Sequence, residues 1–279
     1  MSDDPTVAAD VATLAGNVIS KREVIQNMAV PRSVTNYKLR DLLPGCAYQV
    51  EIVASSSYGG KTLRSEPTNS NIATLPEAVL SIELECATTS SLSVRWDTAG
   101  TPGLNHLFYK LAIQGVGFDH SLMLDIPSEV TTHEFANLPE PLGQGREYNI
   151  TIVVVAKVGD IEVHSEAADS IFSTLPAPPS DLWASSGAEV SWTASPSPFV
   201  SGYRLTWKST KEGAELHEAH ISASSLSCTL TGLNDNEVYR VSVVSVVRFD
   251  GEEEGRQVES EELKEELIYT EKEGLRVYI

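Results

Sequence analysis

The stretch from Leu39 to Val53 reads Leu-Arg-Asp-Leu-Leu-Pro-Gly-Cys-Ala-Tyr-Gln-Val-Glu-Ile-Val. Pro44-Gly45 is a turn signal. After it, Tyr48, Val50 and Ile52 alternate with other residues, so a strand would place their side chains on one face. A tyrosine at the start of a strand after such a turn can bury its ring and direct its hydroxyl to a nearby backbone group. This arrangement is the tyrosine corner of Greek-key β-sandwiches.

The same pattern recurs twice, around Tyr148 and Tyr239. Ala73-Thr-Leu-Pro76 and Ser173-Thr-Leu-Pro176 also match, 100 residues apart. A period of 91 to 100 residues indicates tandem domains rather than a short solenoid repeat. Downstream of each tyrosine a Ser-Glu pair and a threonine repeat in phase: Ser65-Glu66, Ser165-Glu166, Ser260-Glu261, Thr74, Thr174 and Thr270.

Two tryptophans mark a strand upstream of the corner in the second and third copies, and a tyrosine marks the next strand. An immunoglobulin domain would have a cystine between its B and F strands, but Val50, Ile150 and Val241 occupy the position two after each corner tyrosine, so no bridge is possible there. This combination resembles the fibronectin type III family over nearly the whole chain. The resemblance implies an all-β fold of tandem immunoglobulin-like Greek-key β-sandwiches, the first of them incomplete. The residues expected in the cores are Tyr48, Tyr148, Tyr239, Trp96, Trp192, Tyr109 and Tyr203.

The repeats divide the chain into four parts. Residues 1–76 would be a partial domain with the C-terminal strands only, residues 77–176 and 177–271 complete domains, and residues 272–279 a linker or tail. Within the first part, residues 24–30 and 34–39 are expected to be strands. The spacing of apolar residues from Asp4 to Val18 allows a short helix, and the alternative, which we favour, is a frayed remnant of a truncated domain.

Composition excludes several classes of function. The net charge is −19, which argues against nucleic acid and against anionic membrane surfaces as partners. The longest nearly apolar stretch, residues 150–156, is far shorter than the ~20 residues of a membrane-spanning helix. No secretory signal is recognisable at the start of the sequence. The chain is therefore expected to be intracellular or an internal piece of a longer protein.

The three cysteines, one in each repeat, do not form a disulfide framework. Alternation along residues 80–86 predicts that Cys86 faces a core, and Cys228 is expected on the same inward side as Leu230. Cys46 lies in the corner and is expected to be partly exposed. Cysteine usage leaves the redox compartment open.

Two single positions are candidate sites. Asn149-Ile-Thr151 is the only N-glycosylation sequon, and Asn149 should face solvent because it follows the inward Tyr148. It is either a glycan site or a chance match. Trp183 is expected to point outward, as an interface residue or, as we favour, by packing at the joint to the second repeat.

The acidic stretch formed by residues 252–254 and 259–266 could bind calcium or a basic partner, although it lacks the spacing of an EF-hand loop. We favour a charged edge strand that resists pairing with other chains. The six histidines show no metal-binding pattern, because His217 and His220 would lie on opposite faces of a strand. We therefore predict no metal and no cofactor.

No catalytic signature is present, so the chain is not predicted to be an enzyme. We predict a non-catalytic protein-binding and spacer segment of an extracellular or cell-surface protein, resembling the ectodomains of adhesion molecules and receptor-type tyrosine phosphatases. The partner would be another protein, without nucleic acid and without membrane insertion. One alternative is an intracellular, cytoplasmic structural protein of cytoskeletal or muscle type. The other is an accessory module of a secreted enzyme.

Overall fold

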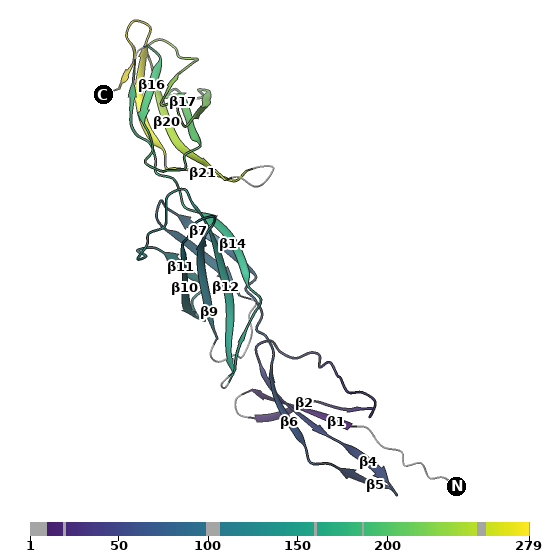
Figure 1. Ribbon diagram of the computed structural model, residues 1–279. Coiled ribbons are helices and arrows are strands. Elements are labelled where there is room, and N and C mark those ends of the chain that lie inside the picture. Colours follow the sequence, from purple (N-terminus) through teal and green to yellow (C-terminus); the bar gives the residue numbers. More distant parts are fainter. Residues whose placement is uncertain are drawn as a thin grey trace.

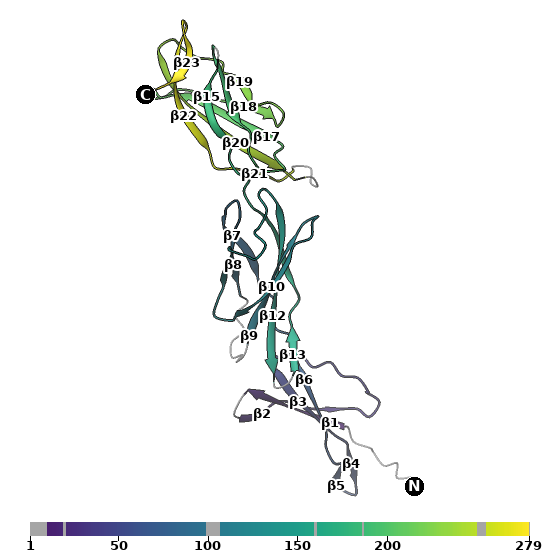
Figure 2. The ribbon, with the colours of Figure 1, turned by 60° about the vertical axis from the view of Figure 1, so that its left-hand side comes forward.

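The computed structural model describes residues 10–18, 21–98, 107–158, 161–185, 187–249 and 255–278. Every regular element among these residues is a β-strand. Figures 1 and 2 show three groups of strands, placed end to end in chain order, which we name the first, second and third modules. The structure is therefore all-β, as the repeats predict.

The second module is a two-layer sandwich. One layer has the order β10-β9-β12-β13, with β14 also paired to β12, and the other has the order β11-β8-β7. Trp96, Phe135, Tyr148, Ile150 and Ile152 are at most 1% exposed between them. The strands are β7 (Ser81–Ala87), β8 (Leu92–Asp97), β9 (Leu107–Gly115), β10 (Ser121–Pro127), β11 (Thr132–Phe135), β12 (Glu147–Val158), β13 (Ile161–His164) and β14 (Ala168–Ser173).

The third module repeats this plan with the layers β15-β16-β19 and β18-β17-β20-β22-β23, and β21 pairs with β20. Trp192, Leu205, Tyr239, Val241 and Val243 form the centre of its core. The strands are β15 (Ser180–Ala184), β16 (Glu189–Thr193), β17 (Gly202–Ser209), β18 (Leu216–Ser222), β19 (Ser227–Thr229), β20 (Glu237–Arg248), β21 (Gln257–Glu259), β22 (Leu263–Thr270) and β23 (Gly274–Val277).

The first module has one four-stranded sheet, in the order β2-β1-β3-β6. This is the order of β10-β9-β12-β14 in the second module, and no second layer faces it among the described residues. A short hairpin of β4 and β5 extends from it. Its strands are β1 (Asp10–Val18), β2 (Lys21–Val30), β3 (Ala47–Val53), β4 (Ser55–Tyr58), β5 (Lys61–Arg64) and β6 (Thr68–Ala73).

Two expectations for the first module are wrong. Residues 10–18 form β1 rather than a helix or a frayed remnant, because β2 and β3 flank this segment and supply backbone hydrogen-bond partners on both sides. Residues 34–39 form no strand, since no neighbouring strand pairs with them. Residues 24–30 do lie in a strand, β2. Residues 1–9 lie outside the described residues.

The single sheet leaves apolar surface uncovered. Ile52 is 50% exposed, whereas Ile152 and Val243, which hold the same place after the corner tyrosine, are fully buried. The two clusters of buried hydrophobic residues contain no residue before Val79. Two layers are needed to bury both apolar faces. Among the side chains whose burial is described, from Met28 onward, Tyr48 is the only buried hydrophobic residue before Val79, so this part of the first module has little core of its own.

The tyrosine corner has the same geometry in all three modules. Each tyrosine hydroxyl accepts a hydrogen bond from the backbone N–H of the residue five positions earlier. The donors are Leu43 (2.7 Å), Gly143 (2.6 Å) and Asn234 (2.8 Å), bonded to Tyr48, Tyr148 and Tyr239 respectively.

The repeated Ser-Glu pairs mark a break in the last long strand of each sheet. In the second module, Ser165 lies between β13 and β14, where its Oγ accepts a hydrogen bond from Val154 N (2.9 Å) and donates to Glu166 O (2.7 Å). Ser65 and Ser260 form the same pair of bonds in the other modules. The serine thus satisfies a backbone amide that the break in pairing would leave without a partner.

The C-terminal part of the third module corrects the interpretation of residues 272–279 as a linker or tail. Residues 274–277 form β23, which pairs with β22. Leu275 is 3% exposed, belongs to the core of the module, and donates a backbone hydrogen bond to Gly187 O (2.7 Å). Burial of Leu275 helps to hold this short segment against the sheet.

A β-bulge overturns the prediction that Cys86 faces the core. The pairing of β7 with β8 shifts between Leu84 and Cys86, so the alternation of faces is broken at that point. Cys86 is exposed as a result. Cys228 is half-buried against the core of the third module, and Cys46 is also half-buried.

Candidate interaction site at the joint between the second and third modules

Buried hydrogen bonds hold the linker between the second and third modules. Ala177, which is 8% exposed, donates its N–H to Ser197 Oγ (2.7 Å) and accepts from Ser195 Oγ (2.6 Å). The next two residues, Pro178-Pro179, restrict the backbone further. The linker therefore packs against the loop that precedes β17 and is not a free connection between two domains.

The corner of the second module faces the third module across this linker. Tyr148 and Thr174 hold the corner in place. Thr174, which is fully buried, donates to Gly143 O (2.5 Å) and accepts from Arg146 N (3.1 Å). The motif that defines the fold thus also sets the position of Arg146 and Glu147 at the joint.

Three polar interactions connect the two modules directly. Arg256 Nη2 lies 2.5 Å from Glu147 Oε1, and Arg256 Nη1 donates to Ile171 O (3.1 Å). Ser197 Oγ donates to Gln144 Oε1 (2.8 Å). One arginine of the third module therefore contacts both β12 and β14 of the second.

A cation–π contact completes the joint. The Arg146 guanidinium lies 4.4 Å from the ring centroid of Phe118 in its own module and 4.2 Å from that of Phe199 in the third. Such contacts contribute roughly 0.5–1 kcal/mol each where solvent reaches them. Arg146 thus bridges an aromatic ring from each module.

A hollow of about 240 Å³, which we name the joint hollow, opens between the modules. Gly145 allows this close approach: its φ is +60°, and a Cβ there would lie 3.0 Å from Val247 Cγ2 of the third module. The hollow is lined by Val116, Phe118, Gly145, Arg146, Glu147, Phe199, Val247, Arg248 and Phe249.

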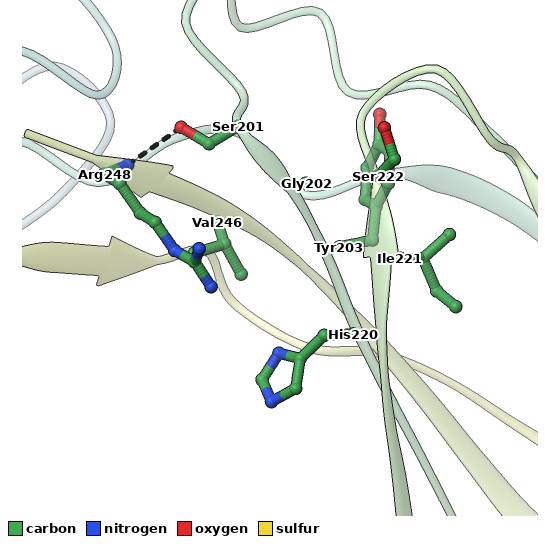
Figure 3. A pocket seen from close by; sticks show the side chains of 8 residues that line it. All are labelled: Ser201, Gly202, Tyr203, His220, Ile221, Ser222, Val246 and Arg248. Atoms are coloured by element: carbon green, nitrogen blue, oxygen red, sulfur yellow. Dashed lines mark hydrogen bonds between the residues drawn. The ribbon is translucent and has the colours of Figure 1, made fainter.

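A second hollow of about 180 Å³, which we name the sheet pocket, lies where β17 begins and β20 ends. Figure 3 shows Arg248 and His220 on separate sides of it, with Ser201 hydrogen-bonded to the Arg248 backbone (3.0 Å). Gly202 sits against Ile221 O, where a Cβ would lie only 2.5 Å away. Arg248 lines both hollows.

The aromatic residues predicted for the cores lie away from this site. Trp96 meets Tyr109 edge to face with 5.5 Å between ring centroids, and Trp192 meets Tyr203 in the same way at 5.5 Å. All four side chains are at most 5% exposed. Their contribution to function is to hold the sandwiches that present the joint.

The sequon lies in the middle of a sheet. Asn149 on β12 is paired with Gln114 and Ile171 on the neighbouring strands, and its side chain is half-buried. Its Nδ2 lies 3.4 Å from Asp169 Oδ1, and Thr151 Oγ1 donates to the same carboxylate oxygen (2.5 Å). Glycosylation of Asn149 stays a prediction.

Trp183 is 42% exposed on β15, opposite Ser191. It is not among the residues that line either hollow. Its role as an interface residue stays a prediction. The residues that do form the joint, such as Phe199 and Arg256, were not identified from the sequence.

The acidic stretch is described only in part, because residues 252–254 lie outside the described residues. β23 pairs along the outer side of β22 only from Leu267 to Thr270, so the described acidic residues before Leu267 lie beyond this pairing, at the edge of the sheet, as expected for this stretch. Its carboxylates are partly neutralised: Glu266 pairs with Arg240. The bond from Arg204 holds the pKa of Glu259 below its usual range.

Metal ligands and membrane spans can be assessed over the described part of the chain. No group of three or more His, Cys, Asp or Glu residues there could hold a metal ion. His217 stacks on Trp207 with 5.4 Å between ring centroids, while His220 pairs with Glu218. None of the described residues belong to a helix long and apolar enough to cross a bilayer.

Residues 177–261 match the family model of the fibronectin type III domain. The third module is a fibronectin type III domain. The second module has the same two layers, the same strand order and the same tyrosine corner, so the chain contains tandem fibronectin type III β-sandwiches.

Among known proteins, the chain is 26% identical over 227 residues to the receptor-type tyrosine-protein phosphatase eta of Gallus gallus. The match covers 80% of this chain but only 15% of that protein. Two solved structures are similar. A two-domain fibronectin type III segment of chicken tenascin has 23% identity and a TM-score of 0.41, over 68% of this chain and 98% of that one. The FN1–FN3 domains of chicken CNTN1 have 16% identity and a TM-score of 0.36, over 95% and 90%.

Proposed function

We propose that this chain is a non-catalytic protein-binding and spacer segment of an extracellular or cell-surface adhesion or receptor protein. The observation that supports the spacer role best is the joint, where Arg256 contacts Glu147 and Arg146 contacts Phe199 across the module boundary. Domains joined by a bare linker move relative to each other. Contacts of this kind instead hold one relative orientation, as a spacer needs.

The proposed division places the first module in residues 1–76 and the second in residues 77–176. The third would begin at residue 177 and extend through β23, beyond the boundary expected at residue 271. The match to a receptor-type phosphatase covers a small part of that protein, so it supports an ectodomain setting and says nothing of catalysis in this segment.

A distance measurement between the modules tests the spacer role. In the full chain, the three cysteines are replaced by serine, and spin labels are attached through Ser121→Cys in the second module and Glu212→Cys in the third, both exposed. We expect one narrow distance distribution, as narrow as that of a control pair within the second module, at Ser121 and Thr132. A broad distribution, as a flexible linker gives, would refute the fixed spacer.

One observation favours the intracellular structural alternative, namely that Cys46, Cys86 and Cys228 are all free thiols. Reduced thiols are typical of cytosolic proteins. The sequon at Asn149 separates the two settings. Protein purified from its natural source should have a glycan on Asn149 if it is extracellular, and an unmodified Asn149 together with cytosolic fractionation would favour the alternative.

A further inference from the structure

Two arginines at the joint have no carboxylate partner among the residues that the structure describes. Seven arginines lie between residues 77 and 279, and five of them form an ion pair with a glutamate. The other two, Arg146 and Arg248, form no ion pair with a described carboxylate, and both line the joint hollow. The five that are paired are Arg95, Arg204, Arg240, Arg256 and Arg276.

This distribution is unexpected in so acidic a chain, which has 39 acidic and 20 basic side chains. Glu147 also lines the hollow, but its Oε1 already forms an ion pair with Arg256 Nη2 at 2.5 Å. The hollow therefore presents two guanidinium groups whose charge no described carboxylate balances, and a carboxylate from outside would be complementary to them.

The walls of the joint hollow are apolar. Phe118, Phe199 and Phe249 line it together with Val116 and Val247. Phe199 is 45% exposed and Val116 is 42% exposed, so part of this surface is open to an incoming side chain. Exposed aromatic and arginine side chains in a cleft between domains are typical of binding hot spots.

The sheet pocket continues this surface on the other side of Arg248. Ser201 and Ser222 border it with hydroxyl groups, and His220 with an imidazole. These groups can donate to or accept from the backbone of an extended chain. Because Arg248 lines both hollows, a ligand bound to its guanidinium would have an apolar compartment on one side and a polar one on the other.

We propose that the joint hollow and the sheet pocket together bind an acidic peptide segment of a partner protein that has an aromatic residue next to its carboxylate. The aromatic side chain would lie among the phenylalanines, and the carboxylate would bind Arg248 with support from Arg146. The net charge of −19 repels long polyanions, so a short acidic segment fits better than a nucleic acid. This inference rests on the proposed function, in which the partner is another protein.

The probe is a capped pentapeptide, Gly-Glu-Phe-Glu-Gly, titrated into the full isotope-labelled chain while backbone amide signals are followed by NMR. Its controls replace both Glu by Gln or by Lys. We expect the Glu peptide to shift the signals of Gly145, Phe199 and Arg248, with an affinity about tenfold higher than that of the Gln peptide. The Lys peptide should shift none of them. Absence of shifts at the joint, or equal binding of the Glu and Gln peptides, would overturn the proposal.

A matched pair of variants tests the assignment to Arg248. Arg248→Gln should lower the affinity for the Glu peptide about tenfold. Arg240→Gln removes the same charge from the same strand, but that arginine is paired with Glu266, so the affinity should stay within about twofold. Equal losses in both variants would indicate non-specific electrostatic attraction and would refute a binding site formed by the joint hollow and the sheet pocket.

The peptide titration and the distance measurement can fail separately. A narrow distance distribution without peptide binding would refute this inference but leave the spacer role supported.

Discussion

Arg256 Nη2 lies 2.5 Å from Glu147 Oε1, across the boundary between the second and third modules. The Arg256 side chain is 50% exposed, and pairs of this kind contribute about 0–1 kcal/mol to stability. We therefore expect Arg256→Ala to leave the unfolding of both modules nearly unchanged but to widen the distance distribution between labels at residues 121 and 212. High salt should widen it in the same way, because salt screens exposed charges.

Arg276→Ala is the matched control, since Arg276 pairs with Glu273 inside the third module. It should leave the distance distribution as narrow as in the parent chain. If the Arg256→Ala chain also stays narrow at low salt, the ion pair is not what holds the modules together, and the cation–π contact of Arg146 and the hydrogen bond from Ser197 to Gln144 become the next candidates.

Tyr148 should make the second module sensitive to alkaline pH. Burial raises the pKa of Tyr148 above its ordinary value of about 10, although the bond from Gly143 N–H and the nearby Arg146 oppose the shift. A raised pKa in the folded state means that the neutral phenol is favoured by folding. Its contribution is complete below about pH 10 and is lost as the pH rises through the folded-state value.

Urea unfolding followed from neutral pH to above about pH 10 measures this effect. We expect Tyr148→Phe to cost about 0.5–1.5 kcal/mol at neutral pH, because Gly143 N–H loses its acceptor, and to reduce the fall in stability at alkaline pH. Tyr278→Phe, at a site that is 53% exposed, should change neither quantity. An unchanged alkaline slope in Tyr148→Phe would show that other groups cause the dependence.

Ser165→Ala should destabilise the second module by about 1–3 kcal/mol, because it leaves the buried N–H of Val154 without an acceptor. Ser165 is 9% exposed, whereas Ser65 makes the same bond at an exposed position. Ser65→Ala should therefore cost less, since water can replace the lost acceptor. Denaturant unfolding of the two variants gives the comparison, and equal costs would contradict the role assigned to burial.

Much of the fold could be predicted because its signals are local. The corner around Tyr148 combines a turn with the alternating Ile150 and Ile152, so the sequence by itself specifies both the turn and the buried face. Three copies in phase then gave the division into modules. The strands that contain the corner tyrosines and the core tryptophans were predicted for this reason. The breaks at Ser165 and Ser260 and the strand β23 were not, because sequence alternation does not reveal them.

The errors arose where a distant partner determines the local structure. The helical spacing in β1 is overridden by pairing with β2 and β3 on both sides. Cys86 is exposed because the register against β8 shifts by one residue, which reverses the faces. Leu275 is buried only because β23 pairs with β22 and the Leu275 N–H bonds to Gly187 O.

The contacts at the joint could not be predicted from the sequence for a similar reason. Arg146 and Phe199 are separated by 53 positions, and their contact depends on the angle between two domains, which no local pattern encodes. A local signal at the joint is Pro178-Pro179, because two consecutive prolines stiffen a linker. Trp183 was predicted from the sequence to point outward, yet the exposed aromatic residue that contacts the other module is Phe199.

Trp96→Ala and Trp192→Ala should each unfold their own module. Both indoles are 1% exposed at the centre of a core, and loss of a buried tryptophan typically costs 3–5 kcal/mol, about the whole stability of a small domain. The neighbouring module has a separate core cluster, so it should keep its own unfolding transition. Calorimetry of both variants tests this. If either substitution removed the unfolding transitions of both modules together, the joint would make the two modules one cooperative unit.

Hydrogen exchange should show that the first module is the least stable of the three. The backbone amides of β3, β12 and β20 occupy the same place in their sheets, and they differ in what covers the apolar side. Ile52 on β3 is 50% exposed, whereas Ile152 on β12 and Val243 on β20 are fully buried. A sheet without a second layer opens more easily, because opening exposes little additional apolar surface. We therefore expect the amides of β3 to exchange at least about tenfold faster than those of β12 and β20. Protection of β3 equal to that of β12 would mean that the full chain covers this sheet, for instance by pairing with a second copy, and sedimentation at several protein concentrations would then reveal the assembly.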